Sequence, residues 1–417
     1  MATSKKRKKI TIVGTSVYGI ENAGDETLLS VLIRELRVRE PNCHITWVAR
    51  HKNERLAKEY GCDRVVVGLE HETKAASEGR WFNGLNKNDP TGHLHALDAI
   101  IRESDLLIIG GDPFQEITLS FNRGLASYAA LLITHAKFVG TPVMLYSIHM
   151  GSKLISSYAK EVTKYCIENA ALVTLREDFS LTRLHELGIR TDNCVVVSDT
   201  AWALNPVPLK DMSPAAKKFF AQLPKGKRVI GFNIRHNYWQ WSERFWGTTA
   251  DELAAFCDHI IETHDAVILS IPNCTYDIDH AMEDDRPIAH DIRKRMKHKN
   301  AFHCLEDRVK LNAILSIFPK LWAHVSNRRH SAIFAAVHKV PVLPLGGSWH
   351  VRPAFDEIWL GGYLIEPEFW TKESLSKNFD AIVDDRENVI ATIEKKLPHL
   401  RKNAVRQADL ALRACKR

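Results

Sequence analysis

Residues 321–346 read LWAHVSNRRHSAIFAAVHKVPVLPLG, and the order of apolar and polar residues in this stretch decides the fold class. The apolar run 321–326 predicts a short buried strand, and PVLPLG at 341–346 predicts a second one. The segment between them is apolar and long enough for a helix. A strand, a helix and a strand in succession form the βαβ unit of a parallel sheet.

The same alternation extends over most of the 417 residues, in two series of strands separated by helical patterns. A stretch with four prolines interrupts it at 205–227, which is typical of a linker between domains. Beyond about residue 370 the sequence is polar and helical in pattern. The expected strands are 9–14, 44–49, 64–68, 105–111, 142–148, 171–176, 194–199, 228–234, 265–272, 301–305, 321–326 and 341–346.

We therefore expect an α/β protein with two Rossmann-like domains facing a cleft and a C-terminal helical tail. The expected boundaries are 1–204 for the N-terminal domain, 205–227 for the linker, 228–370 for the C-terminal domain and 371–417 for the tail. In open parallel sheets, ligands bind beyond the carboxyl ends of the strands. Functional residues are therefore expected directly after the strands.

The composition predicts a globular protein whose partners are anionic. The chain is 45% hydrophobic and carries a formal net charge of +7, which favours phosphates, nucleotides or acidic lipid surfaces; we expect no nucleic acid as a partner. Its eight cysteines include no CxxC pair, so we expect reduced thiols, no structural zinc and a cytoplasmic location. Neither a membrane span nor a signal peptide is expected. The basic residues 5–9 are read as a solvated tail, with contact to the inner face of the membrane as the alternative.

Polar residues and glycines follow three strands of the first series. The turn after 9–14 opens a helix whose free N–H groups can bind an anion, although a simple aspartate N-cap is the alternative. The carboxylates after 105–111 suit a general base, with a capped turn as the alternative. The candidates in this series are Asn22, Gly24, Asp25, Gly111, Asp112, Glu116 and His149.

The second series places cations after its strands. Arg328, Arg329 and His330 follow strand 321–326 at the start of a helix, where the helix dipole disfavours positive charge. An anion bound among them would remove that cost, so we interpret the cluster as an anion site. Arginine after a strand otherwise forms a surface salt bridge. The remaining candidates of this series are Arg235, His236 and Asn273.

Five motifs in this order resemble the polysaccharide pyruvyl transferase family, over about residues 9–347. They are NAGDE (22–26), a Gly-Gly pair (110–111), LREDFSLTRLHELGI (175–189), FNIR (232–235) and RRHSAIFAAVHKVPVLPL (328–345). The resemblance implies a fold like that of GT-B glycosyltransferases. It also implies transfer of the pyruvyl group from phosphoenolpyruvate to a sugar, giving a ketal, in cell-surface polysaccharide or glycoconjugate biosynthesis.

The resemblance also implies roles for residues. The family's Arg-Leu-His signature falls on Arg328, Arg329 and His330, with arginine in place of the middle leucine. The N-terminal domain would be the acceptor side, with Asp112 or Glu116 as base, and the C-terminal domain the donor side, with His330 as acid. Asp112 stands where the family usually has a third glycine. We expect no metal and no cofactor, with phosphoenolpyruvate as a co-substrate.

Two other functions are compatible with the same residues. A GT-B glycosyltransferase would bind a nucleotide-sugar donor in the same fold, and a non-catalytic protein would bind sugars or nucleotides without turnover. The sequence does not identify the acceptor sugar, its carrier (a nucleotide or a polyprenyl diphosphate), the ketal positions or the oligomeric state.

Overall fold

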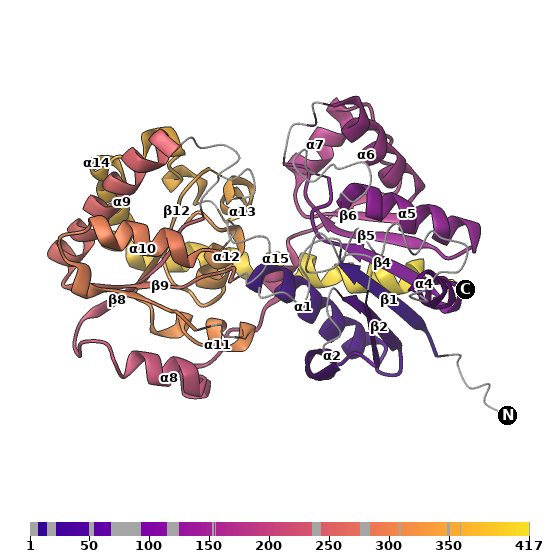
Figure 1. Ribbon diagram of the computed structural model, residues 1–417, viewed down its shortest axis with the longest axis horizontal. Coiled ribbons are helices and arrows are strands. Elements are labelled where there is room, and N and C mark those ends of the chain that lie inside the picture. The colour runs from indigo at the N-terminus through magenta and orange to yellow at the C-terminus, as the bar shows by residue number, and fades with distance from the viewer. Residues whose placement is uncertain are drawn as a thin grey trace. The chain divides into compact units, whose positions relative to one another are not determined.

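The computed structural model describes residues 7–14, 22–49, 54–67, 93–114, 125–151, 154, 156–235, 243–275, 284–307, 310–347, 351–358 and 360–416 (Figure 1). The chain forms two compact units. Unit 1 comprises Met1–Ile20, Asp25–Ala203 and Arg401–Arg417, and unit 2 comprises Glu21–Gly24 and Leu204–Leu400. Each unit is therefore built from segments that are separated in the sequence.

Unit 1 contains a parallel sheet of seven strands among its described residues, in the order β3-β2-β1-β4-β5-β6-β7. Its strands are β1 (Lys9–Gly14), β2 (His44–Ala49), β3 (Arg64–Val67), β4 (Leu106–Gly110), β5 (Val143–Ile148), β6 (Leu172–Leu175) and β7 (Cys194–Val196). Its helices are α1 (Ala23–Arg39), which starts in unit 2, α2 (Glu54–Tyr60), α4 (His93–Glu103), α5 (Leu125–Phe138), α6 (Ser157–Asn169), α7 (Asp178–Glu186) and the 3-10 turn η2 (Thr200–Ala203).

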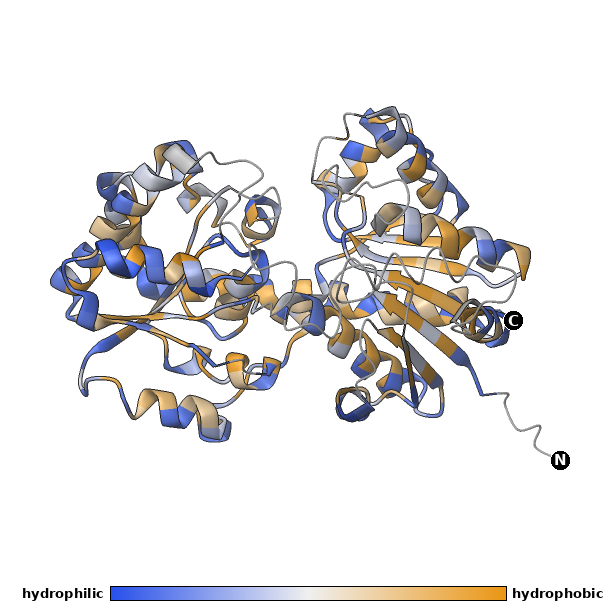
Figure 2. Cartoon of the chain, in the orientation of Figure 1, coloured by the Kyte–Doolittle hydropathy of each residue, from blue (hydrophilic) through white to orange (hydrophobic). Residues whose placement is uncertain are grey.

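The central strand β4 shows why this sequence forms a fully covered sheet. Leu107 and Ile109 pack into a core with residues of α4, α5, α6 and α7. Leu106 and Ile108 pack into a second core with residues of α1 and α2 and the end of the chain. A strand buried on both faces needs a continuous apolar run rather than an alternating one, and LLIIG provides it. Figure 2 shows the strands mostly in the colour of apolar residues.

Unit 2 has a five-stranded parallel sheet in the order β10-β9-β8-β11-β12. Its strands are β8 (Arg228–Asn233), β9 (Ala266–Ser270), β10 (Phe302–Cys304), β11 (Ala323–Ser326) and β12 (Val342–Pro344). Its α-helices are α8 (Pro214–Phe220), α9 (Glu243–His264), α10 (Arg286–Arg295), α11 (Leu311–Leu315), α12 (Arg329–Val337), α13 (Val351–Glu357), α14 (Lys372–Asp384) and the first part of α15 (Arg386–Ala414). Its 3-10 turns are η3 (Leu209–Asp211), η5 (Lys299–Ala301), η6 (Phe318–Lys320), η7 (Gly361–Tyr363) and η8 (Pro367–Phe369).

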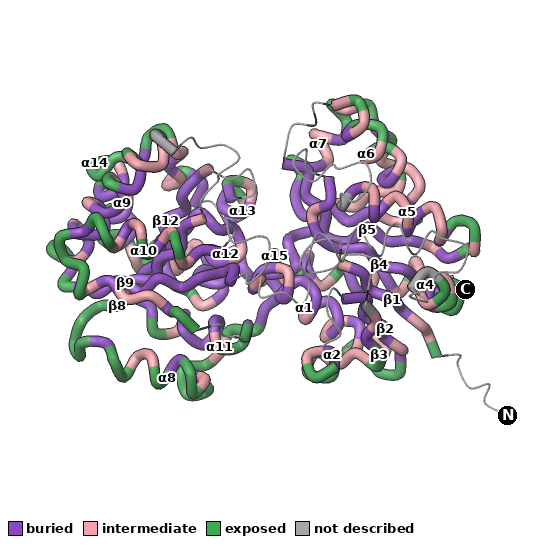
Figure 3. The backbone as a smooth tube through the Cα atoms, in the orientation of Figure 1, coloured by how far each residue is buried: buried purple, intermediate pink, exposed green. Residues whose placement is uncertain are grey.

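The proline-rich stretch 205–227, which we expected to be a linker, is part of unit 2. Pro214 begins helix α8, because a proline in the first turn lacks only an N–H that would have no helical partner. Ser213 caps that helix through its side chain, and Met212 and Leu223 are buried. Figure 3 shows α8 with exposed segments along it, as a helix on the surface of its unit has.

The end of the chain is helical, as the expected tail was. Helix α15 runs from unit 2 into unit 1. There Gln407 is buried, and both the oxygen and the nitrogen of its side-chain amide form hydrogen bonds. Its Oε1 accepts from Thr174 Oγ1 at 2.9 Å, and its Nε2 donates to Thr200 Oγ1 at 2.9 Å. Lys416 N also donates to Asp105 O at 2.8 Å. None of the helices in the described ranges combines the length and the apolar composition that crossing a bilayer requires.

Candidate active site

The carboxyl ends of β8, β9 and β11 carry most of the predicted residues of unit 2. Arg235 follows β8, Asn273 follows β9, and Arg328 follows β11. These strands lie side by side in the sheet, in the order β9-β8-β11. The strand-end rule therefore selects residues that the fold brings to one edge. Glu116 and His236, which the sequence also suggested, lie outside the described residues.

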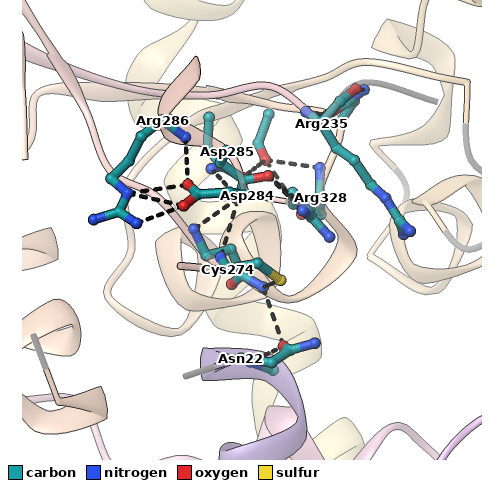
Figure 4. Close-up of polar contacts among 12 residues, drawn as sticks. Asn22, Arg235, Cys274, Asp284, Asp285, Arg286 and Arg328 are labelled. Carbon is teal, nitrogen blue, oxygen red and sulfur yellow. Dashed lines mark hydrogen bonds and ion pairs between the residues drawn. The ribbon is translucent and has the colours of Figure 1, made fainter. Parts of the chain in front are cut away.

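One buried carboxylate, Asp285, connects this edge (Figure 4). Its Oδ2 accepts from Asn233 Nδ2 at 3.1 Å, Asn273 N at 2.9 Å and Cys274 N at 3.1 Å. Its Oδ1 accepts from Arg328 Nε at 3.1 Å and also from Nη2 of the same guanidinium. Asp285 precedes α10 as its N-cap but makes no side-chain cap there, so its carboxylate serves the strand ends instead.

The ion pair between Arg328 and Asp285 explains how a cation is tolerated at the start of a helix, where the helix dipole disfavours positive charge. Arg328 is the N-cap of α12, and Asp285 supplies a negative charge beside it; both side chains are buried. Buried charges persist when they are paired and hydrogen-bonded, as these are. Arg329 and His330 occupy the first turn of α12, and Arg329 is buried. Arg328 is therefore held in place by a carboxylate of the protein itself.

Arg235 is positioned through its backbone. Its N–H donates to Asn327 Oδ1 at 2.6 Å, and its carbonyl accepts from Asn327 Nδ2 at 3.0 Å. The buried Asn327 thus extends the β8–β11 pairing beyond the last strand residues by means of a side-chain amide. The sequence did not identify Asn327 as a candidate, because attention went to the neighbouring cationic residues Arg328 and His330.

His330 is held against the start of α1 and against an aromatic ring. A Cβ added to Gly24 would lie 2.1 Å from His330 Nδ1, and the imidazole stacks on Phe334 with an interplanar angle of 24°. Ala23 N donates to Asn273 O at 2.9 Å, and Asn22 Oδ1 accepts from Gly24 N at 3.0 Å. Asn22, Gly24, Asn273 and His330 therefore belong to one assembly, in which glycine is needed for close approach.

A Gly24→Ala variant should lower turnover while the protein stays folded. The added methyl group would force the His330 ring away from its position, and the ring would move rather than the backbone of α1. We expect His330 to be the general acid, and a shift of about 1 Å in such a group can reduce the rate by ~10²-fold. Steady-state kinetics with circular dichroism as the folding control would measure this. Wild-type kcat in Gly24→Ala would contradict a role for the present position of His330.

Unit 1 holds a second group of candidates at the end of β4. Gly111 has φ of 101°, a conformation that favours glycine, and it turns the chain so that Asp112 Oδ2 accepts from Arg176 Nη2 at 2.5 Å. Within the described part of the chain, the buried Asp112 Oδ1 has no hydrogen-bond partner. A carboxylate that a guanidinium fixes through one oxygen has the form of a positioned base.

Arg176 was missed by the sequence reasoning, although it lies in the quoted motif LREDFSLTRLHELGI. It is buried after β6 and also lies 3.5 Å from Asp199 Oδ2 and 4.0 Å from Glu177 Oε2. Burial lowers the pKa of Arg176, but the charges of Asp112, Asp199 and Glu177 outweigh it, so the net shift is upward. The guanidinium therefore stays charged and fixes Asp112.

His149, predicted after β5, is fully buried and paired. Its Nδ1 lies 2.6 Å from Glu177 Oε1, which also accepts from Ser180 Oγ. A Cβ at Gly151 would lie 2.0 Å from His149 Nε2, so only glycine fits beside the ring. Asp25 lies in the first turn of α1 and, like Gly111, Asp112 and His149, belongs to unit 1. The predicted residues thus fall into two groups, one in each unit.

Solved structures with the same fold act on nucleotide sugars or are glycosyltransferases. The UDP-GlcNAc 2-epimerase of Methanocaldococcus jannaschii is 14% identical, with a TM-score of 0.66 over 97% of this chain and 99% of that one. The UDP-GlcNAc 2-epimerase of Neisseria meningitidis, bound to UDP-GlcNAc, is 13% identical, with a TM-score of 0.61 over 97% and 99%. A glycosyltransferase from Rickettsia africae is 12% identical, with a TM-score of 0.62 over 98% and 99%.

Identities this low show the fold alone, which is GT-B-like with two Rossmann-like units, as the sequence predicted. No curated protein matches the chain. Residues 22–348 match the family described as polysaccharide pyruvyl transferase. This match covers most of the chain and every strand from β2 to β12, together with the cation cluster of unit 2. The chain belongs to the polysaccharide pyruvyl transferase family.

Proposed function

We propose that the protein transfers the pyruvyl group of phosphoenolpyruvate to two hydroxyl groups of a sugar, forming a cyclic ketal. The observation that carries the proposal is that Arg235 and the first residues of α12, Arg329 and His330, follow neighbouring strands of one sheet, beside the Asp285–Arg328 ion pair. Phosphoenolpyruvate bears a phosphate and a carboxylate, and arginine forks bind both groups through charge-assisted hydrogen bonds.

The proposed reaction balances with one acid and one base. Two C–O bonds form between C2 of phosphoenolpyruvate and the sugar, and the C2–O bond to phosphate breaks. The two sugar hydroxyl groups lose two protons. In the overall balance, C3 gains one proton as it becomes a methyl group, and the released inorganic phosphate takes the other. We assign the proton delivery to His330 and the deprotonation of a hydroxyl to Asp112, which Arg176 positions. Each such step contributes ~10²–10⁴-fold.

The acceptor in this proposal is a sugar attached to a diphosphate carrier, which is either a nucleotide or a polyprenyl chain. The net charge of +7 favours an anionic acceptor. A nucleotide-linked sugar is further supported by the fold, since the N. meningitidis epimerase of the same fold is bound to UDP-GlcNAc. Incubation with phosphoenolpyruvate and a panel of acceptors, followed by phosphate release and a mass gain of the acceptor, tests the proposal. Turnover with nucleotide-sugar donors and none with phosphoenolpyruvate would instead identify a glycosyltransferase.

Replacement of Arg235 by alanine is expected to weaken phosphoenolpyruvate binding by about 10- to 100-fold, because a charge-assisted contact contributes ~1.5–3 kcal/mol. The backbone bonds to Asn327 remain in this variant, so the fold should be retained. Titration calorimetry with phosphoenolpyruvate gives the affinity. Arg286→Ala is the matched control, because its guanidinium is already bound to Asp284. Equal affinity in Arg235→Ala and wild type would exclude Arg235 from the donor site.

A further inference from the structure

Two histidines and an aspartate converge where α9 packs against α14 in unit 2. His259 Nε2 lies 3.0 Å from Asp380 Oδ2, and His264 Nε2 lies 2.7 Å from Asp380 Oδ1. One candidate ligand atom from each residue can be chosen so that all three lie within 4.8 Å of one another. None of the three residues takes part in the proposed reaction, so the cluster requires a separate explanation.

The three side chains are joined by hydrogen bonds in the metal-free protein, and their spacing is a few tenths of an ångström shorter than that of ligands around a metal ion. Zinc binds imidazole nitrogen at about 2.0–2.1 Å in a tetrahedral arrangement, which places neighbouring ligand atoms about 3.3 Å apart. The nitrogen–oxygen distances in this cluster are 2.7, 3.0 and 3.2 Å. A small outward movement of the side chains would therefore admit an ion. Asp380 and His259 are partly exposed, which provides a route of entry.

The surroundings orient both imidazoles. Thr263 Oγ1 lies 3.4 Å from His259 Nδ1, which directs the Nε2 atom of that ring to Asp380. His264 packs against Phe379 and Trp322, with ring centroids 5.4 and 5.7 Å away. Metal-binding histidines usually have their second nitrogen held by a neighbour and their ring fixed by packing. His259 has the first of these features and His264 has the second.

We propose that His259, His264 and Asp380 form a binding site for a divalent transition metal ion such as Zn²⁺, with a fourth position open to water. Two nitrogen ligands and one oxygen ligand suit Zn²⁺ and its neighbours, whereas Mg²⁺ and Ca²⁺ prefer oxygen alone. The ion would tie α14 to α9. His259 and His264 lie 121 and 116 residues before Asp380, so no short ligand-spacing motif in the sequence indicates the site. The site is independent of the proposed pyruvyl transfer.

A second cluster of possible ligands provides a control. His290, Cys304 and Glu306 also lie close enough together for a metal, and His290 Nε2 is 3.1 Å from Glu306 Oε2. His290 and Glu306 are exposed, with 46% and 57% of their side-chain surfaces accessible to solvent, whereas His264 is buried. We therefore expect this second cluster to be the weaker site.

Competition for Zn²⁺ between the full chain and a coloured chelator tests the proposal. Wild type is expected to bind one Zn²⁺ at the cluster, and His259→Gln and Asp380→Asn are expected to weaken binding by at least ~10²-fold, since even indirect supports of a metal contribute 10–100-fold. His290→Gln should bind as wild type does. Loss of binding in His290→Gln alone, unchanged binding in His259→Gln, or no binding by wild type would each overturn the proposal.

Spectroscopy of wild type with Co²⁺ tests the site even if the variants do not fold. Co²⁺ bound by two imidazoles and a carboxylate in a four-coordinate site absorbs visible light far more strongly than hydrated Co²⁺. We expect that absorption to appear at one equivalent and to disappear when Zn²⁺ is added. Zn²⁺ should also raise the melting temperature of wild type by mass action, and not that of a folded His259→Gln variant. A Co²⁺ spectrum like that of the free ion would rule the site out.

Discussion

In a His330→Gln variant, kcat for pyruvyl transfer is expected to fall by ~10²-fold or more, while phosphoenolpyruvate still binds. Glutamine retains hydrogen-bonding capacity but cannot deliver a proton, so this substitution separates the acid from a simple phosphate ligand. His330 is held between Gly24 and Phe334, and its ring is therefore confined in the free protein. Single-turnover kinetics and calorimetric binding of phosphoenolpyruvate together measure the two effects.

The pH profile of kcat gives an independent readout of the same variant. Loss of the acid's proton should switch off wild-type turnover at high pH, so the basic limb should disappear or move in His330→Gln. His338→Gln is the matched control, because His338 ends the same helix with Nδ1 bonded to Phe334 O and Nε2 accepting from Val207 N. If His330→Gln keeps most of its kcat, or keeps the basic limb, the histidine only binds phosphate, and His149 is the next residue to test.

An Asp285→Ala variant is expected to lose about 3–5 kcal/mol of unfolding free energy, because it leaves the Arg328 guanidinium buried and without its carboxylate. The same change removes the acceptor for Asn273 N and Cys274 N, two buried backbone donors. The proposed donor site should therefore lose its geometry when the protein loses stability. Urea-induced unfolding followed by tryptophan fluorescence measures the difference in free energy.

Two further variants make this prediction specific to the ion pair. Asp284→Ala removes a neighbouring buried carboxylate whose partner, Arg286, is more exposed, so it should cost clearly less. Asp285→Ala combined with Arg328→Met removes both charges and should recover part of the lost stability. If Asp284→Ala and Asp285→Ala destabilise equally, Asp285 has no special structural role.

The fold could be predicted because each buried strand is encoded locally. LLIIG of β4 is apolar throughout and HITWVA of β2 is nearly so, and local runs of this kind predict strands between helices. The structure of the proline-rich stretch was harder to predict, because a proline such as Pro214 is found both in breaks and at helix starts. Here a helix starts, and the Ser213 side chain caps it. The choice depends on contacts such as Ser213 N to Ser316 Oγ, which join residues 103 positions apart.

The site could be predicted in part, for a similar reason. Residues that directly follow strands, such as Arg235, Asn273 and Arg328, are found by the topology rule alone. Their partners are not, since Asp285 stands before a helix and resembles an ordinary cap until its distant contacts are known. The role of Arg176 could not be predicted either, because it depends on the hydrogen bond to Asp112, which is 64 residues away. Such partners become visible only when the chain is folded.

The return of the chain into unit 1 sets a limit on how this protein can be recombined with a relative. Unit 1 is completed by Arg401–Arg417, whose Gln407 and Lys416 bind Thr174, Thr200 and Asp105. A fragment ending at Ala203 would expose the apolar surface that Ala408 and Ala411 cover. A chimaera that exchanges the first 203 residues must therefore bring its own last 17 residues with them. The segment to exchange in engineering is therefore discontinuous, with one junction after Ala203 and another before Arg401.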